Sequence, residues 1–150
     1  FHGRDLFGYC AARLASGIID FEGVGPAYPV EEIVTHEILE PSLRPGCAEG
    51  IFEIDDPNFG NLWTNIPTRL FTQCGFAYGD TLRLEIVHGD ETVFDRRVPF
   101  HKSFGYVSEG EPIIYNNELM KVALAVSRGS FKAKFGAGFG PEWRVRFTKA

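Results

Sequence analysis

From residue 50 onward, short stretches of alternating apolar and polar residues recur roughly every ten residues, with turn-forming residues between them. In residues 82–86 leucine and isoleucine alternate with arginine and glutamate, and His88-Gly89-Asp90 then predicts a hairpin turn. Further strands are expected at residues 51–55, 93–98, 112–115, 119–126 and 143–147. Many short antiparallel strands must hide their edges, so a barrel or a sandwich is expected. We predict a mainly β fold, a small closed antiparallel β-barrel.

A different pattern occupies the first part of the chain. Residues 4–16 predict a helix, with Asp5 as N-cap, Leu6, Cys10 and Leu14 at four-residue spacing, and Gly17 as its end. Residues 18–46 are rich in glycine and proline and predict a linker, in which residues 30–38 form a short extended or helical insert.

One helix before a set of strands is unusual for a self-contained domain. We therefore interpret residues 1–46 as the terminal helix and linker of an amino-terminal α/β domain, and residues 47–150 as a carboxy-terminal barrel domain. The chain begins with Phe1 rather than methionine and enters a motif at once, so a segment upstream is expected.

Composition narrows the classes of partner and compartment. The formal net charge of −5 argues against a general nucleic-acid surface, which needs a basic field. No apolar run approaches the ~20 residues of a membrane helix, and no signal peptide is evident, so no membrane partner is expected. The three cysteines are widely spaced and form no Cys-x-x-Cys pair. They predict reduced thiols in a cytoplasmic protein, without a disulfide or a metal site.

The most informative stretch for function is residues 50–67. Its strand is broken by Asp-Asp-Pro-Asn, since proline cannot donate a ladder hydrogen bond and Asp and Asn cap turns. Phe59 and Trp63 then offer flat faces, Asn61 offers a paired donor and acceptor, and Gly60 lets main chain approach a ligand. This combination can hold a planar heterocycle such as a purine. The alternative is a tight corner between strands with core aromatics.

Other candidates each have a structural alternative. His2 could bind an anion or act as an acid or base, or belong to a frayed terminus. Asp55 and Asp56 could bind ribose hydroxyls or an ammonium group, or cap the turn, and Glu118 beside Asn117 is ambiguous in the same way. Arginines on strand faces predict a solvated exterior: Arg83, Arg96, Arg97, Arg144 and Arg146. The glycines of residues 136–140 predict a loop, because no strand-then-helix pattern surrounds them.

Three ordered blocks carry a resemblance that covers essentially the whole chain. Ile54-Asp55 followed by Phe59-Gly60-Asn61-Leu62-Trp63-Thr64-Asn65-Ile66-Pro67 resembles the signature of the S-adenosylmethionine hydroxide adenosyltransferases, a family related to the fluorinases and chlorinases. Phe1-His2-Gly3-Arg4-Asp5 resembles the family's Thr-Phe-His-Gly-Arg-Asp segment without its threonine. Residues 112–117 and 124–126 resemble its Tyr-x-Asn-Ser and Ile-Ala-x-Asn stretches.

The resemblance implies the carboxy-terminal half of a two-domain enzyme. In that family an α/β domain joins an antiparallel barrel, and trimers bind the substrate between the first domain of one subunit and the barrel of the next. Water or hydroxide attacks the ribose C5′ of S-adenosylmethionine in line, methionine leaves, and adenosine is the product. S-adenosylmethionine is then the substrate, and no separate cofactor is expected.

The resemblance also implies roles for particular residues. Asn61 would hydrogen-bond the adenine edge, and main-chain groups of Val126 and Arg128 would complete its recognition. The methionine amino group would meet Asp55 or Asp56, between which the sequence does not decide. His2 would help activate water. Phe59, Trp63 and Phe104 would line or stack on the purine, and the substrate-binding set also includes Tyr115, Asn117 and Glu118.

Two departures from the family pattern leave alternatives open. Glu118 replaces the serine that would bind the methionine carboxylate, so it points elsewhere, meets the ammonium group or alters substrate handling. The acid and arginine that would work with His2 lie upstream of this chain, so the chain alone is expected to show little turnover. Alternative functions are a halogenase, a non-catalytic purine-binding barrel and an oligonucleotide-binding barrel.

Overall fold

The computed structural model describes residues 1–35 and 38–149, and the chain divides into two compact units, Phe1–Glu37 and Ile38–Ala150. Secondary structure in the first unit begins with a π-helical turn, Gly3–Gly8, which continues into α1, Tyr9–Ala15. Short 3-10 turns follow at Glu22–Val24 and Val30–Glu32. No residue of these four elements is buried within the unit.

The predicted helix is confirmed, but its predicted cap is wrong. Asp5 lies inside the first helical turn, where its carboxylate accepts hydrogen bonds from the Arg4 guanidinium instead of capping main-chain N–H groups. The predicted end is confirmed: Gly17 has a φ of +69°, and Ile18 N donates to Arg13 O at 3.0 Å. Only a residue that tolerates the left-handed region closes a helix in this way, which explains the glycine.

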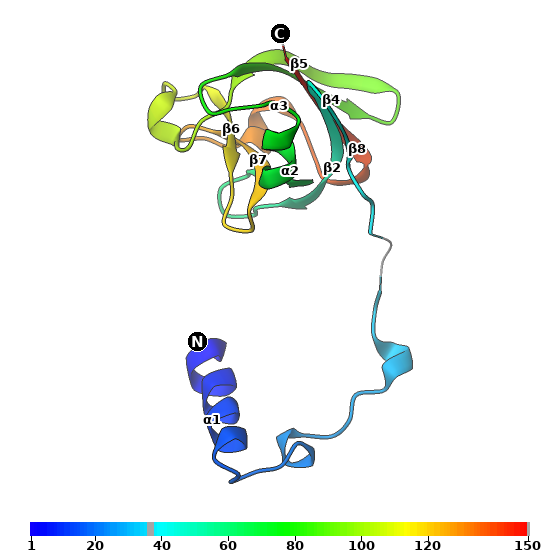
Figure 1. Ribbon diagram of the computed structural model, residues 1–150, viewed down its shortest axis with the longest axis vertical. Coiled ribbons are helices and arrows are strands. Elements are labelled where there is room, and N and C mark those ends of the chain that lie inside the picture. The colour runs from blue at the N-terminus through cyan, green and yellow to red at the C-terminus, as the bar shows by residue number, and fades with distance from the viewer. Residues whose placement is uncertain (36–37, 150) are drawn as a thin grey trace. The chain divides into compact units, whose positions relative to one another are not determined.

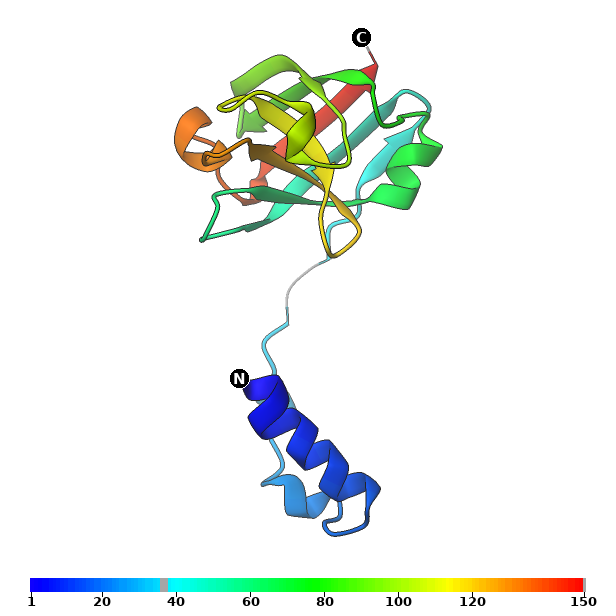
Figure 2. The same cartoon turned by 90° about the vertical axis from the view of Figure 1, so that its left-hand side faces the viewer.

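The second unit is a nearly closed β-barrel (Figures 1 and 2). Its strands are β1 (Ser42–Arg44), β2 (Cys47–Asp55), β3 (Leu62–Pro67), β4 (Thr81–His88), β5 (Glu91–Pro99), β6 (Pro112–Asn116), β7 (Lys121–Val126) and β8 (Gly140–Lys149). Seven of them run in the order β5-β4-β8-β2-β3-β7-β6, and β1 pairs with β2. All of these pairings are antiparallel.

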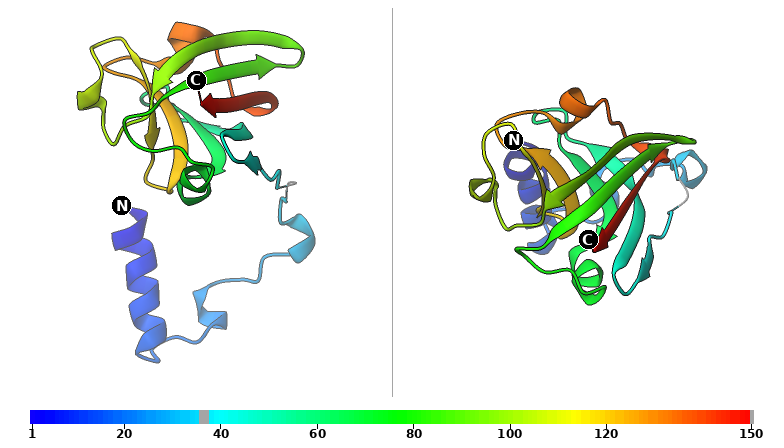
Figure 3. Two further views of the ribbon diagram at one scale, coloured as in Figure 1. Left: turned by 45° about the horizontal axis from the view of Figure 1, so that its top comes forward. Right: turned by 90° about the horizontal axis from the view of Figure 1, so that it is seen from above.

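The barrel closes between the first and last strands of that order. The closing contact is a parallel bridge between Phe100 and Ile114, supported by a hydrogen bond from His101 N to Ile114 O at 3.0 Å. In a series of seven strands that each run antiparallel to the next, the first and the last run in the same direction. The pair that closes the barrel is therefore parallel. The view from above in Figure 3 shows the strands curling around one core. The predicted mainly β fold with a small barrel is confirmed.

Short helices stand at opposite ends of the barrel: α2 (Thr68–Gln73) and α3 (Phe131–Phe135) (Figures 2 and 3). Each buries a phenylalanine at its own end. Phe71 of α2 contacts Phe76, with ring centroids 4.4 Å apart, and Phe131 of α3 lies 5.5 Å from Phe94. These large rings fill the volume that inward-facing strand residues leave at the ends of the barrel.

Several local predictions change in the structure. Residues 42–44, which the sequence pattern assigns to the linker, form β1 and pair with β2. The insert predicted at residues 30–38 is a 3-10 turn at Val30–Glu32, and residues 36 and 37 lie outside the described part. The two-residue turn between β4 and β5 is confirmed, as are the exposed arginines of the strand faces.

The structure also describes the cysteines, the helices and the potential metal ligands of residues 1–35 and 38–149. Cys10, Cys47 and Cys74 are free thiols. No helix in these ranges has the length and apolar content to cross a membrane. Nor do they contain a group of three or more His, Cys, Asp or Glu side chains suited to a metal ion.

Candidate functional site

The turn between β2 and β3 is held by its own main chain and by Asp56. Asp56 N donates to Asn61 O at 2.9 Å, and Gly60 N donates to Asp56 O at 2.7 Å. The Asp56 carboxylate accepts from Asn58 N at 2.9 Å, as a turn-capping acid does. One oxygen of Asp56 is therefore used inside the turn.

This turn docks on the start of α3 through Gly60. Lys132 N donates to Gly60 O at 3.0 Å, and Ser130 caps α3 by accepting from Ala133 N, also at 3.0 Å. A Cβ on Gly60 would lie 1.9 Å from the Ser130 hydroxyl oxygen, and Gly60 has a φ of +67°. Both the conformation and the contact require glycine here.

A pocket of about 1250 Å³ opens between this turn, η4 (Phe104–Tyr106) and the segment that leads into α3. The pocket lies beside the outer face of β3, β7 and β6. On that face Trp63, Ala123 and Tyr115 form one row across the three strands. Leu62 and Leu124 point the opposite way, into the core. The lining residues are Asp55, Asp56, Pro57, Asn58, Phe59, Gly60, Asn61, Trp63, Phe104, Tyr115, Glu118, Val126, Arg128, Gly129, Ser130, Lys132, Ala133, Gly136 and Ala137.

Aromatic side chains supply the flat surfaces of the pocket. Phe59 is 68% exposed and Phe104 41% exposed, and both rings line the pocket. The Phe104 and Tyr115 rings lie 5.2 Å apart. Trp63 contributes an indole whose N–H is buried and has no hydrogen-bond partner among the described residues. Exposed rings around a pocket provide stacking surfaces for a planar ligand.

Asn61 is a polar residue at the pocket wall whose side chain is not needed for the hydrogen bonds of its own turn. It is only 8% exposed, yet the side-chain hydrogen bonds of its turn are made by Asp56 and not by Asn61. Its carboxamide lies near enough to the Tyr115 hydroxyl to lower the pKa of that phenol. A carboxamide at a pocket wall, not needed by its own turn, can offer a donor and an acceptor to a ligand.

Tyr115 remains an uncharged hydroxyl over the physiological range. Burial raises the pKa of Tyr115 to about 12, and the negative charges of Glu118 and Asp56 act in the same direction, against the effect of nearby Trp63 and Asn61. The phenol therefore offers a donor and an acceptor to whatever occupies the pocket.

The two adjacent acids have different surroundings. Asp55 forms an ion pair with Lys132 of α3, while Asp56 caps the turn. Lys132 is not among the candidates that the sequence predicts, and neither are Ser130, Pro57 and Asn58, which also line the pocket. The Ser130 N-cap followed by Gly136 could have identified α3, but a five-residue helix is too short for its hydrophobic period to be recognised.

Arg128 contributes main chain in an uncommon conformation. Its φ is +54°, in the left-handed region that few residues other than glycine adopt. Gly129 N bonds to Val126 O at 3.1 Å across this turn, whereas the Arg128 N–H and C=O make no main-chain hydrogen bond in the described residues. The Arg128 side chain turns to Glu109, 3.3 Å away. Non-glycine residues in this region cluster at ligand sites, and the exposed main chain of Arg128 is accessible to a ligand.

Within the second unit, one sequence-predicted residue does not line the pocket. Asn117 is not among the lining residues, and its carboxamide oxygen accepts from Leu119 N and Lys121 N at 3.0 Å each, which holds the turn between β6 and β7. Its amide nitrogen is buried without a described partner. His2 is an exposed residue of the first unit, whereas all lining residues belong to the second.

Comparison with known proteins identifies the family. Residues 50–144, which include all lining residues of the pocket, match the model of the SAM hydroxide adenosyltransferase C-terminal domain. The chain is 35% identical over 145 residues to the (R)-S-adenosyl-L-methionine hydrolase of Thermus thermophilus, covering 97% of this chain and 48% of the relative. It is 28% identical to a fluorinase of Actinopolyspora mzabensis, with the same coverage of 97% and 48%. The chain thus spans about half the length of these curated relatives.

Two solved structures have a fold similar to that of this chain. An uncharacterized conserved protein from Thermotoga maritima matches with a TM-score of 0.68 and 26% identity, covering 99% of this chain and 52% of the other. A conserved hypothetical protein from Thermus thermophilus matches with a TM-score of 0.54 and 32% identity, covering 98% and 52%. The chain therefore belongs to the SAM hydroxide adenosyltransferase family, of which it contains the C-terminal domain.

Proposed function

We propose that this chain holds the adenosyl part of S-adenosylmethionine in a hydrolase that forms adenosine and methionine. The observation that supports this proposal is the Asn61 carboxamide, which is 8% exposed, unused by its own turn and placed at the wall of an aromatic-lined pocket. A carboxamide presents a donor and an acceptor side by side, which complements the amino group and ring nitrogen at an adenine edge.

Recognition of the base would combine stacking with hydrogen bonds from a side chain and from the main chain. Phe59, Trp63 and Phe104 would contact the faces of the purine, and Asn61 would bond its edge. The unused main-chain groups of Arg128 would add a further bond. These contacts fix the nucleoside, so the C5′ carbon is held in one orientation for displacement.

The proposed reaction needs alignment more than covalent catalysis. A water oxygen attacks C5′, the C5′–S bond breaks, and its electron pair goes to sulfur, which leaves as the neutral thioether of methionine. The attacking water loses a proton and becomes the 5′-hydroxyl of adenosine. Because the sulfonium is already an activated leaving group, exclusion of bulk water and correct geometry are the main contributions of the protein. His2 is proposed to assist the proton transfer.

We further propose that other segments complete the site. The lining residues include no histidine, and the chain spans about half the length of its curated relatives. An amino-terminal domain and a homotrimer with the site at a subunit interface are therefore proposed for the complete, cytoplasmic enzyme. The chain alone would then bind nucleoside but show little turnover.

Halogenation is the second candidate, since fluorinases match this chain at 28% and 34% identity. Halide attack at the same carbon would give a 5′-halogenated nucleoside in place of adenosine. By the resemblance, His2 matches the histidine of the hydrolases where halogenases carry tyrosine, and fluorinases carry serine in place of Gly3. These two residues favour hydroxide over halide as the nucleophile.

The experiment incubates the full-length protein with S-adenosylmethionine in ¹⁸O-enriched water, with and without fluoride or chloride. We expect adenosine that carries ¹⁸O at its 5′-hydroxyl, one methionine per adenosine, and no change on adding halide. A halogenated nucleoside would assign the second candidate. Adenosine binding without methionine release would identify a non-catalytic purine-binding barrel.

A further inference from the structure

Lys132 joins both ends of the turn between β2 and β3 to α3. Its main-chain N donates to Gly60 O at 3.0 Å, and its ammonium group pairs with the Asp55 carboxylate at the end of β2. Residues 57–59 at the tip of the turn are exposed, so burial contributes little to the orientation of the turn. Lys132 therefore clamps the turn that carries Asn61 to α3.

The helix that bears Lys132 is itself held in place. Phe131, the residue before it, is fully buried, and its ring centroid lies 5.5 Å from that of Phe94 in the core. Further along α3, the Lys134 ammonium donates to Gly110 O, in the connection between β5 and β6. Because α3 is fixed both to the core and to a second segment, a contact with Lys132 gives the turn a fixed position.

The place of Lys132 within α3 is unfavourable for the helix itself. It is the second residue of α3, where the unpaired main-chain N–H groups of a helix start favour an anion over a cation. Its side chain is about half exposed, and that of Asp55 is 20% exposed. The Lys132 ammonium also lies 5.9 Å from the centre of the Phe139 ring. The ion pair with Asp55, and not the helix, accounts for a lysine at this position.

On the basis of the proposed function, we propose that Lys132 is a positioning residue for adenine recognition. By holding Asp55 and Gly60 against α3, it keeps the Asn61 carboxamide in the orientation that meets the edge of the base. Asn61 follows Gly60 directly in the chain, so a shift of the turn moves the carboxamide with it. Half of this clamp is an exposed ion pair. Salt should therefore reduce its contribution to the binding of adenosine, although adenosine carries no charge.

The test measures the binding of adenosine and of S-adenosylhomocysteine by calorimetry in the full-length protein and in variants of the clamp. Lys132→Gln removes the charge, Lys132→Arg keeps it, and Asp55→Asn removes the charge of the partner. The double variant of Lys132→Gln and Asp55→Asn completes a double-mutant cycle, which separates the ion pair from the single side chains. Lys149→Gln is the matched control, because Lys149 is exposed, lies 3.9 Å from Asp80, and neither residue lines the pocket.

We expect Lys132→Gln to weaken adenosine binding about threefold at low salt, and Lys132→Arg and Lys149→Gln to bind adenosine like the parent. The double variant should lose no more than Lys132→Gln alone, and the loss should disappear at about 1 M salt.

Unchanged adenosine affinity in Lys132→Gln, or additive losses in the double variant, would overturn the clamp. A loss for S-adenosylhomocysteine alone would also overturn it, because Lys132 would then contact the amino-acid part of the ligand. Failure of the parent to bind adenosine would instead overturn the proposed function itself.

Discussion

Gly60 determines whether the pocket exists in this form. It allows the left-handed main chain of the β2–β3 turn and the close approach of Ser130, which together place Phe59 and Asn61 opposite α3. The sequence predicts that Gly60 lets a ligand approach the main chain. In the structure Gly60 instead lets Ser130 approach closely, and this contact shapes the pocket.

Gly60→Ala is expected to destabilise the protein and weaken adenosine binding. Left-handed conformation alone costs about 1–2 kcal/mol for alanine, and the contact with Ser130 adds to that cost. Gly46→Ala is the matched control, because its φ is +74° but nothing lies within 4 Å of the added Cβ. Urea unfolding should show a clearly larger loss for Gly60→Ala. Equal losses would mean that the Ser130 contact is easily relieved.

Tyr115 gives a pH dependence whose direction follows from its raised pKa. An unfolded tyrosine ionises near pH 10, whereas the folded phenol ionises at about 12. Between these values the folded state binds more protons than the unfolded state, so stability falls as pH rises from about 10 to 12. Tyr115→Phe removes this contribution. Its free energy of unfolding relative to the parent should therefore increase between pH 9 and pH 11, and a constant difference would contradict the assigned burial.

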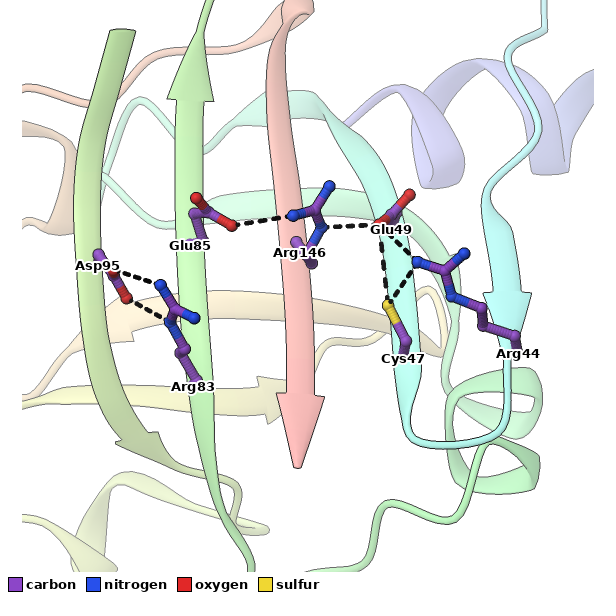
Figure 4. Close-up of polar contacts among 7 residues, drawn as sticks. All are labelled: Arg44, Cys47, Glu49, Arg83, Glu85, Asp95 and Arg146. Atoms are coloured by element: carbon purple, nitrogen blue, oxygen red, sulfur yellow. Dashed lines mark hydrogen bonds and ion pairs between the residues drawn. The ribbon is translucent and has the colours of Figure 1, made fainter. Parts of the chain in front are cut away.

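At the scale of elements, an ionic ladder made of two separate groups lies on the outer face of the sheet, one group from β1 to β4 and the other joining β4 to β5 (Figure 4). Arg146 on β8 joins Glu49 on β2 at 2.7 Å and Glu85 on β4 at 3.3 Å. Arg83 forms a two-bond pair with Asp95 of β5, at 2.8 and 2.7 Å. The ladder lies on strands that contribute no lining residue except Asp55, so it supports the barrel rather than the pocket.

Arg146→Gln should lower the free energy of unfolding by about 0.5–1 kcal/mol, because it leaves two carboxylates side by side. The loss should shrink in 1 M salt, where charges are screened. Arg97→Gln, at an exposed arginine without an ion pair in the described residues, is the control and should show no loss. A loss for Arg146→Gln that is independent of salt would assign its contribution to packing of the side-chain stem.

Local sequence pattern, rather than strand length, decided how well each strand could be predicted. β4 alternates buried and exposed residues and was predicted, as were the central parts of β5 and β8. The five-residue β6 was also predicted, whereas only the second half of the nine-residue β2 was. β3 was missed because Thr64 and Asn65 are buried polar residues that break the alternation. Asn65 is satisfied by Ile51 N at 3.0 Å and Leu39 O at 2.7 Å, a pairing that no local pattern reveals. β1, α2 and α3 are too short for any period to show.

At the scale of the whole molecule, the sequence located the parts of the pocket that lie close together in the chain. Phe59, Asn61 and Trp63 were predicted as a group because their types and spacing suit a planar ligand. Lys132 and Ser130 were not, because only the docking of α3 on Gly60 brings them there. Asn117 was assigned to the substrate from the family pattern, whereas the bonds seen here hold its own turn.

The central claim is that Asn61 and its aromatic neighbours bind adenine, and calorimetric titration with adenosine tests it most directly. The parent protein should bind adenosine more tightly than inosine, whose 6-oxo group replaces the amino group. Asn61→Ala should weaken adenosine binding by about 1–3 kcal/mol and remove the preference over inosine, while Asn61→Asp keeps the shape and loses the donor. Equal affinity for adenosine in the parent and in Asn61→Ala would contradict the account.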